Sequence, residues 1–92
     1  MTPAEEERRG VDAQHVMENK IYREAYAALE ARYVDEMAQQ DIDPKRAEYL
    51  RTLLVAGRKH RQYMEQVLIT GTMAAMELER RRSLRDRLLR KA

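Results

Sequence analysis

Two apolar patterns run side by side along the second half of the chain, and they constrain the fold more than any other feature. Each pattern advances in alternating steps of three and four residues, the spacing that gathers side chains on one face of a helix. The first seam consists of Ala47, Leu50, Leu54, Gly57, Arg61, Met64, Leu68, Gly71, Ala75 and Leu78. The second seam consists of Tyr49, Leu53, Ala56, His60, Tyr63, Val67, Thr70 and Ala74. Because the seams lie about 100° apart around the helix, one can receive a helix of the same chain while the other needs a different cover.

The seams belong to a long helix that is predicted to run from Pro44 to Lys91. Asp43 is a good capping residue, and Pro44 suits the first helical position, where its missing N–H is not needed. Before this start, one apolar stripe predicts a helix from about residue 20 to residue 40. That stripe is formed by Tyr22, Tyr26, Leu29, Tyr33 and Met37. The short connection through residues 41–43 makes the two helices antiparallel.

Helix lengths indicate that the chain cannot cover its own long helix. Residues 19–40 span roughly 33 Å and residues 44–91 roughly 70 Å at 1.5 Å per residue. A first short helix over residues 12–18 could cover part of the excess, and a neighbouring subunit the rest. The sequence therefore predicts an all-α fold, an antiparallel helical hairpin with a long C-terminal helix that assembles as a homo-oligomer. The expected organisation is a disordered N-terminus at residues 1–10, a hairpin oligomerisation domain at residues 11–79 and a basic tail at residues 80–92.

Two positions leave the helix boundaries open. Asn19 could cap a new helix that starts at Lys20, or a single helix could continue through it. Gly71 lies between two threonines, and these poor helix formers could break the long helix there.

The predicted interface with a neighbouring subunit follows the second seam. Arg61 is added to it from the first seam, because a charged residue at a seam position could pair with Glu65 or Asp35 of a neighbour. The alternative is that its stem packs while its head reaches water. The predicted interface residues are Tyr49, Leu53, Ala56, His60, Tyr63, Val67 and Arg61.

Positive charge is concentrated at the C-terminal end. Residues 80–91 contain seven basic residues and one acid, a balance of +6, whereas the rest of the chain has 11 basic and 15 acidic residues, a balance of −4. Such a segment can contact the phosphates of nucleic acid or an acidic partner without reading sequence, although it could also be a frayed, solubilising terminus. The predicted contact residues for DNA or a partner protein are Arg80, Arg81, Arg82, Arg85, Arg87, Arg90 and Lys91.

The residues for catalysis are scarce. There is no cysteine, the two histidines are His15 and His60, and the only serine, Ser83, lies in the basic tail without a positioned base. No spacing typical of a metal site or a phosphate-binding loop is present. We therefore expect a protein that is not an enzyme and needs no cofactor. With no apolar run of 18 residues and no signal-peptide pattern, a cytoplasmic protein without membrane contact is expected.

The chain resembles the short small-terminase-like packaging proteins of tailed phages and gene transfer agents. The resemblance covers about residues 13–78. It rests on Asn19 opening a helix, on Glu24-Ala25-Tyr26 and on the turn from Asp41 to Pro44. It rests also on the segment from Arg46 to Arg51 of a long helix rich in arginine and glutamate, and on Gly71 near the end of that helix. It departs from larger small terminases, which begin with a helix-turn-helix domain for which this chain has no room. The resemblance implies a homo-oligomeric ring of helical hairpins that engages double-stranded DNA weakly, with little sequence specificity, and recruits or regulates the large terminase motor.

Two other functions remain open from the sequence. A helical-bundle regulator that binds nucleic acid would show a basic helix face, but the region before the tail is net acidic. An adaptor that binds only proteins, such as an antiactivator or an export chaperone, would use a two-seamed helix equally well. In the packaging family, the C-terminal segment commonly contacts the motor, so the basic tail could bind protein instead of DNA.

Overall fold

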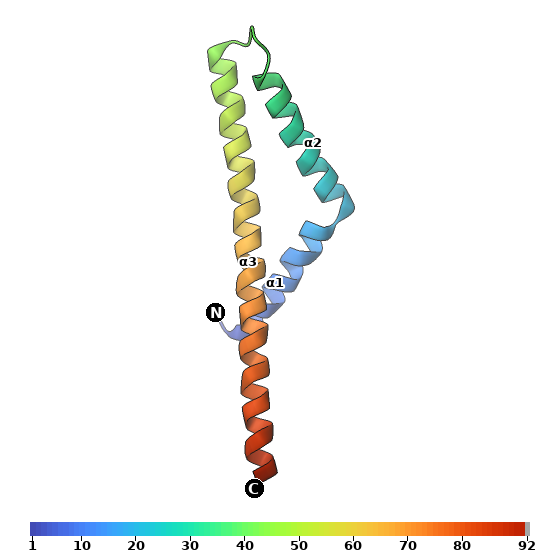
Figure 1. The fold of residues 1–92 in the computed structure, drawn as a ribbon, viewed down its shortest axis with the longest axis vertical. Helices are drawn as coiled ribbons and strands as arrows, with labels where there is room; N and C mark the ends of the chain where they lie inside the picture. The colour runs from blue at the N-terminus through green and yellow to red at the C-terminus, as the bar shows by residue number, and fades with distance from the viewer. Residues whose placement is uncertain (92) are drawn as a thin grey trace. The chain divides into compact units, whose positions relative to one another are not determined.

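The computed structural model describes residues 1–91 and forms helices throughout most of that range. The elements are α1 (Pro3–Glu18), α2 (Lys20–Met37) and α3 (Pro44–Lys91), and no strand occurs in the described residues (Figure 1). The all-α prediction is confirmed. The last residue of the predicted tail, Ala92, lies outside the described part.

Side-chain caps fix the starts of α2 and α3. Asn19 has an extended backbone, with φ −60° and ψ 126°, and its side chain accepts a hydrogen bond of 3.0 Å from the backbone N–H of Tyr22. The chain therefore breaks at Asn19, one of the two alternatives left open by the sequence. The carboxylate of Asp43 accepts from the backbone N–H of Arg46 at 3.2 Å, as its predicted capping role requires. Helix α2 ends at Met37, three residues earlier than predicted.

Helix α1 begins at Pro3, inside the segment of residues 1–10 that the sequence predicted to be disordered. The hydroxyl of Thr2 accepts from the backbone N–H of Glu5 at 3.2 Å and caps this start. Residues 5–9 are all charged and show no apolar periodicity, so the sequence pattern gives no sign of an amphipathic helix there. The buried positions of α1 are Gly10 and Ala13, which are too small to register as an apolar stripe.

Helix α3 is continuous through Gly71, so the second possible break does not occur. The hydroxyl of Thr72 donates to the backbone carbonyl of Leu68 at 3.1 Å, which satisfies that polar side chain inside the helix. Gly71 itself is buried. Close packing at the glycine offsets its poor helix propensity, which costs about 1 kcal/mol relative to alanine.

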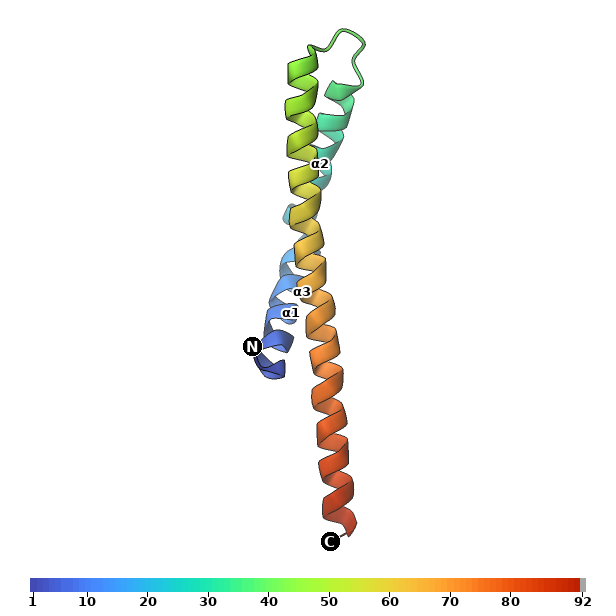
Figure 2. The same ribbon diagram turned by 90° about the vertical axis from the view of Figure 1, so that its left-hand side faces the viewer.

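The chain divides into two compact units, and the division falls within α3. One unit contains residues 1–15 together with α3 from Met64 onward, and the other contains Val16–Tyr63. In the second unit, α2 and the first part of α3 lie side by side near their connecting loop (Figures 1 and 2). Leu50 is the centre of their packing, with 1% of its surface exposed.

Two ion pairs tie α2 to α3 within this second unit. Arg46 contacts Glu36 at 2.9 Å, and Arg58 contacts Glu30 at 2.7 Å. Arg58 lies further along α3 than Arg46, whereas its partner Glu30 comes earlier in α2 than Glu36. This reversed order is the one expected for antiparallel helices. Both pairs are partly exposed, so each adds little to stability and serves mainly to fix the register.

In the first unit, α1 and α3 approach each other through small residues. Gly10, Ala13, Gly71 and Ala74 are all buried there. A Cβ atom added to Gly71 would lie 2.6 Å from the Cα of Gly10, and one added to Gly10 would lie 2.8 Å from the Cα of Gly71. The two backbones are therefore in direct contact at this crossing, with no room for any side chain between them.

None of the helices in residues 1–91 combines the length and apolar character needed to traverse a lipid bilayer.

Candidate functional site

The first seam of α3 is the internal face of the protein. Leu50 and Gly71 are buried, and all the other members except Arg61 are half-buried. In the second unit this seam meets α2, and in the first unit Gly71 meets α1. One of the two predicted seams is therefore largely covered by the chain itself.

The second seam is open over its N-terminal half. Tyr49 has 55% of its surface exposed and Tyr63 has 64%, and Ala56 and His60 between them are also exposed. Among the remaining predicted interface residues of this seam, Leu53 and Val67 are half-buried. Further along, Thr70 is half-buried and Ala74 is 7% exposed. The surface offered to a partner by this seam is thus confined to residues 49–63.

Leu53 also lines a shallow hollow between α2 and the first part of α3. The hollow has a volume of about 140 Å³ and is largely apolar. It is lined by Tyr26, Leu29, Glu30, Tyr33, Leu53, Leu54 and Gly57. A Cβ on Gly57 would meet nothing within 4 Å, so the missing side chain leaves space here, and no helix packs closely against this glycine within its own chain.

Arg61 packs against an aromatic ring of its own chain. Its guanidinium carbon lies 4.9 Å from the centroid of the Tyr26 ring, a cation–π contact between α3 and α2. Desolvation raises the pKa of Tyr26, the negative charge of Glu30 raises it further, and the positive charge of Arg61 opposes both effects. The predicted pairing of Arg61 with an acid of a neighbouring subunit stays a prediction.

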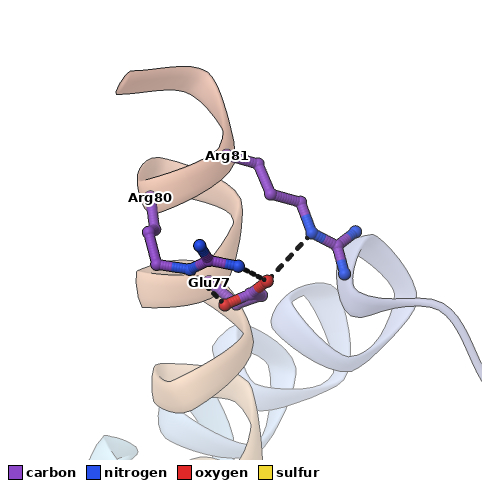
Figure 3. Close-up of polar contacts among 3 residues, drawn as sticks. All are labelled: Glu77, Arg80 and Arg81. Atoms are coloured by element: carbon purple, nitrogen blue, oxygen red, sulfur yellow. Dashed lines mark hydrogen bonds and ion pairs between the residues drawn. The ribbon is translucent and has the colours of Figure 1, made fainter. Parts of the chain in front are cut away.

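The basic tail is helical as far as Lys91, and every residue from Arg80 to Lys91 is exposed. Two arginines at its start share one carboxylate. Arg80 contacts Glu77 at 2.7 Å and Arg81 contacts the same carboxylate at 3.0 Å, from two sides (Figure 3). Hydrogen bonds from these guanidinium groups lower the pKa of Glu77 from its ordinary value of 4.5 to about 2. Arg82 pairs in the same way with Glu79.

These pairs divide the tail into two parts. Arg80, Arg81 and Arg82 have their charge partly neutralised by the two acids of the preceding turn. By contrast, Arg85, Arg87, Arg90 and Lys91 form no ion pair within residues 1–91. The charge balance of residues 80–91 leaves out Glu77 and Glu79, and so it does not show that the first three arginines are paired. The signal was present in the sequence, because Glu77 precedes the first two arginines by three and four residues, the spacing of helical ion pairs.

The part of the chain described by the structure holds no group of three side chains suited to a metal ion. His15 and His60 are both exposed.

No protein-family model, curated protein or solved structure matched the chain. The interpretation of the two surfaces therefore rests on their own geometry and charge.

Proposed function

We propose that this chain is a non-catalytic assembly module that self-associates through its second seam and presents a basic helix end to DNA. The observation that carries the proposal is the contrast between the two seams in the second unit. Leu50 of the first seam is 1% exposed, whereas Tyr49 and Tyr63 of the second seam are more than half exposed. Tyrosine is enriched at protein interfaces because its ring buries a large area while its hydroxyl stays hydrated.

The architecture we infer is an antiparallel helical hairpin of α2 and the first part of α3. The ion pairs between the two helices and the burial of Leu50 support it. In such a hairpin, the exposed second-seam residues Tyr49, Ala56, His60 and Tyr63 lie beside the first seam, which α2 covers. We propose that this surface contacts a different surface of the next subunit. Such head-to-tail contacts extend beyond a dimer, and they form a closed ring when the rotation between neighbouring subunits divides a full turn.

The four cations at the end of α3 that form no ion pair within residues 1–91 support a role in binding polyanions. Contacts from arginine and lysine to phosphates supply affinity without sequence recognition, and they make binding fall steeply with salt. No additional DNA-reading element is required for this activity. The proposed DNA contacts are Arg85, Arg87, Arg90 and Lys91, with a smaller contribution from Arg80, Arg81 and Arg82.

Together these features correspond to a DNA-packaging adaptor of the small-terminase kind, the family that the sequence resembles. In this proposal the ring engages DNA weakly, and it recruits or regulates a large terminase motor that hydrolyses ATP. The apolar side chains of Leu84, Leu88 and Leu89, all exposed, offer the motor a contact in the same segment.

The self-association is tested by light scattering after size exclusion at micromolar concentration. We expect a particle larger than a dimer for the unaltered chain. Tyr49→Glu and Tyr63→Glu should each lower its mass, because both place a charge in the proposed contact. Ile21→Glu is a matched control, since Ile21 is an equally exposed apolar residue of α2 at 69%. A monomer or a plain dimer for the unaltered chain contradicts the ring.

The DNA contact is tested by measuring the affinity for a short duplex over a range of salt concentrations. Replacing Arg85, Arg87, Arg90 and Lys91 with glutamine should reduce the slope of log affinity against log salt by about 3 to 4, since each phosphate contact contributes roughly 0.9. The control replaces four exposed cations outside the tail, Arg23, Arg32, Lys45 and Arg51, with the same change in net charge.

The results also separate the competing functions. Binding that is lost with the control substitutions but kept with the tail substitutions would favour a helical-bundle regulator. Absence of DNA binding at any salt, together with capture of a protein other than a terminase, would favour an adaptor that binds only proteins.

A further inference from the structure

Ser83, the only serine of the chain, directly follows three arginines. It is exposed and lies in the helical part of the basic tail, and the apolar residue Leu84 comes after it. Its hydroxyl forms no hydrogen bond within residues 1–91, whereas the hydroxyls of Thr52 and Thr72 each donate to the backbone carbonyl four residues earlier. The Ser83 hydroxyl is therefore accessible and is not bound by its own helix.

Basophilic serine/threonine kinases recognise arginines that lie two and three residues before the serine they modify. Carboxylates beside the active site of such a kinase bind the two guanidinium groups, and this charge pattern selects the substrate. In this chain Arg81 and Arg80 occupy those two positions before Ser83. None of the four threonines has an arginine two or three residues before it, so Ser83 is distinguished from them by its sequence context.

We propose that Ser83 is a phosphorylation site for a serine kinase that recognises arginine, and that the phosphate weakens the binding of the basic tail to polyanions. In the reaction, the hydroxyl oxygen of Ser83 attacks the terminal phosphorus of ATP. The new O–P bond forms as the bond from that phosphorus to the bridging oxygen breaks, ADP leaves, and a base of the kinase takes the hydroxyl proton. The effect on binding rests on the proposed function, whereas the phosphorylation site does not.

Arg80 and Arg81 must leave their partner in the helix before a kinase binds them. Both contact the carboxylate of Glu77, which lies three and four residues earlier (Figure 3). Their side chains are 61% and 59% exposed, and ion pairs so exposed add little stability. Because pairs at this spacing form only in a helix, unwinding the segment releases both arginines and presents Ser83 in the same step. All of residues 80–91 are exposed, so this unwinding disrupts no buried packing.

A phosphate on Ser83 changes the charge of the basic tail beside its free cations. It adds a charge of about −1.5 to −2 at neutral pH, together with three acceptor oxygens. In the helix, Arg87 follows Ser83 by four residues, the spacing at which an acidic group pairs with a basic one. Arg87 is one of the four cations that form no ion pair within residues 1–91, so the phosphate occupies a proposed DNA contact. The charge balance of residues 80–91 falls from +6 to about +4.

The phosphorylation site is tested by incubating the full chain with ATP and the catalytic subunit of cyclic-AMP-dependent protein kinase, which has this preference for arginine. Mass spectrometry should find one added phosphoryl group, which should be absent from Ser83→Ala. Arg80→Gln combined with Arg81→Gln should slow the reaction about tenfold or more, because the charge pattern is lost. Arg90→Gln combined with Lys91→Gln is the matched control, since it removes the same charge beyond the acceptor and should slow the reaction less than about two-fold.

Two results would overturn the phosphorylation site. One is an equal rate for the two double variants, which would mean that the preceding arginines do not direct the kinase. The other is a full chain that stays unmodified while a synthetic peptide of residues 77–88 is phosphorylated, which would mean that the helix withholds Ser83.

The effect on binding is tested with a short DNA duplex over a range of salt concentrations. Phosphorylation should reduce the slope of log affinity against log salt by about 1 to 2, which corresponds to roughly tenfold weaker binding at about 0.1 M salt for each cation neutralised. Ser83→Ala, treated with the kinase in the same way, should bind like the untreated, unaltered chain. Equal binding by the modified and unmodified chains would overturn control by the phosphate. If neither form binds the duplex at any salt, the proposed DNA contact fails, while phosphorylation at Ser83 still supports the site.

Discussion

Glycine occupies three helical positions in this protein, and its surroundings differ sharply among them. A Cβ at Gly71 would lie 2.6 Å from backbone of α1, whereas a Cβ at Gly57 would meet nothing within 4 Å. We expect Gly71→Ala to lower the free energy of unfolding by about 1–3 kcal/mol, the usual effect of overpacking. Gly57→Ala should raise it by about 1 kcal/mol, because alanine is the better helix former. Urea denaturation followed by circular dichroism measures both changes.

The two variants serve as controls for each other, since both replace glycine by alanine in α3. A stabilising effect at both positions would show that α1 does not cross α3 at Gly71 in solution.

Glu77 should remain ionised in acid well below the usual range of a glutamate. Its pKa is lowered from 4.5 to about 2 by hydrogen bonds from Arg80 and Arg81. Because the folded-state pKa is the lower one, its ion pairs favour the folded helix fully above pH 4.5, and this contribution is lost as the pH falls towards 2. The carboxyl carbon shift of Glu77 in an NMR titration reports the midpoint.

Replacing both Arg80 and Arg81 with glutamine should return that midpoint towards 4.5. A midpoint near 4.5 in the unaltered chain would mean that the shared ion pair does not persist in water.

Several of these residue-level features were predictable from the sequence, and one was not. The caps formed by Asn19 and Asp43 follow from residue type and position, and the pairs of Glu77 follow from helical spacing. The partner of Gly71 did not follow, because Gly10 lies sixty-one residues earlier in a segment without apolar periodicity. Contacts between backbones leave no pattern of side-chain hydropathy.

At the scale of the elements, the cap of α3 determines where the chain turns. Asp43→Ala removes the hydrogen bond to the backbone N–H of Arg46, so we expect a loss of about 1 kcal/mol in the free energy of unfolding. Asp41→Ala is the matched control, since Asp41 lies in the same loop but does not cap the helix. Thermal unfolding at one pH and one salt concentration compares the two variants.

A loss of stability in Asp41→Ala equal to that in Asp43→Ala would indicate that the loop charge, and not the cap, is responsible.

The three helices illustrate what periodicity can and cannot predict. The stripe from Tyr22 to Met37 predicted α2 to within three residues, and Pro44 fixed the start of α3. Helix α1 was predicted only from residue 12, because residues 3–11 are mostly charged or small and show no apolar periodicity. Local propensity itself favours a helix there, since alanine, glutamate and arginine are strong helix formers, and α1 packs against α3 in the first unit through Gly10.

At the scale of the whole molecule, the two compact units should respond differently to a core substitution. Leu50 is the most deeply buried side chain of the second unit, at 1% exposure. Leu50→Ala should lower the free energy of unfolding by about 2–5 kcal/mol. Hydrogen exchange should accelerate more in residues 20–63 than in residues 64–78, since the second unit loses the packing.

Uniform acceleration along the chain would instead show that the two units unfold as one through the continuous helix α3.

The sequence predicted that α3 carries more apolar surface than the chain covers, and the exposure of Tyr49 and Tyr63 agrees with that prediction. It did not separate the exposed residues Ile69, Met73 and Met76 from the seams, because residues 62–76 contain apolar side chains on all faces of the helix. Only the crossing of α1 shows which of those faces are already occupied.

The contact between Gly10 and Gly71 has a consequence for how this protein can diverge. Each glycine faces backbone atoms of the other helix, so no side-chain replacement elsewhere can make room for a larger residue. Homologues that retain α1 in this position should therefore keep glycine at both sites, while the residue corresponding to Gly57 varies freely. Lineages that lose one of the two glycines are expected to lose the other soon afterwards, along with the crossing that required them.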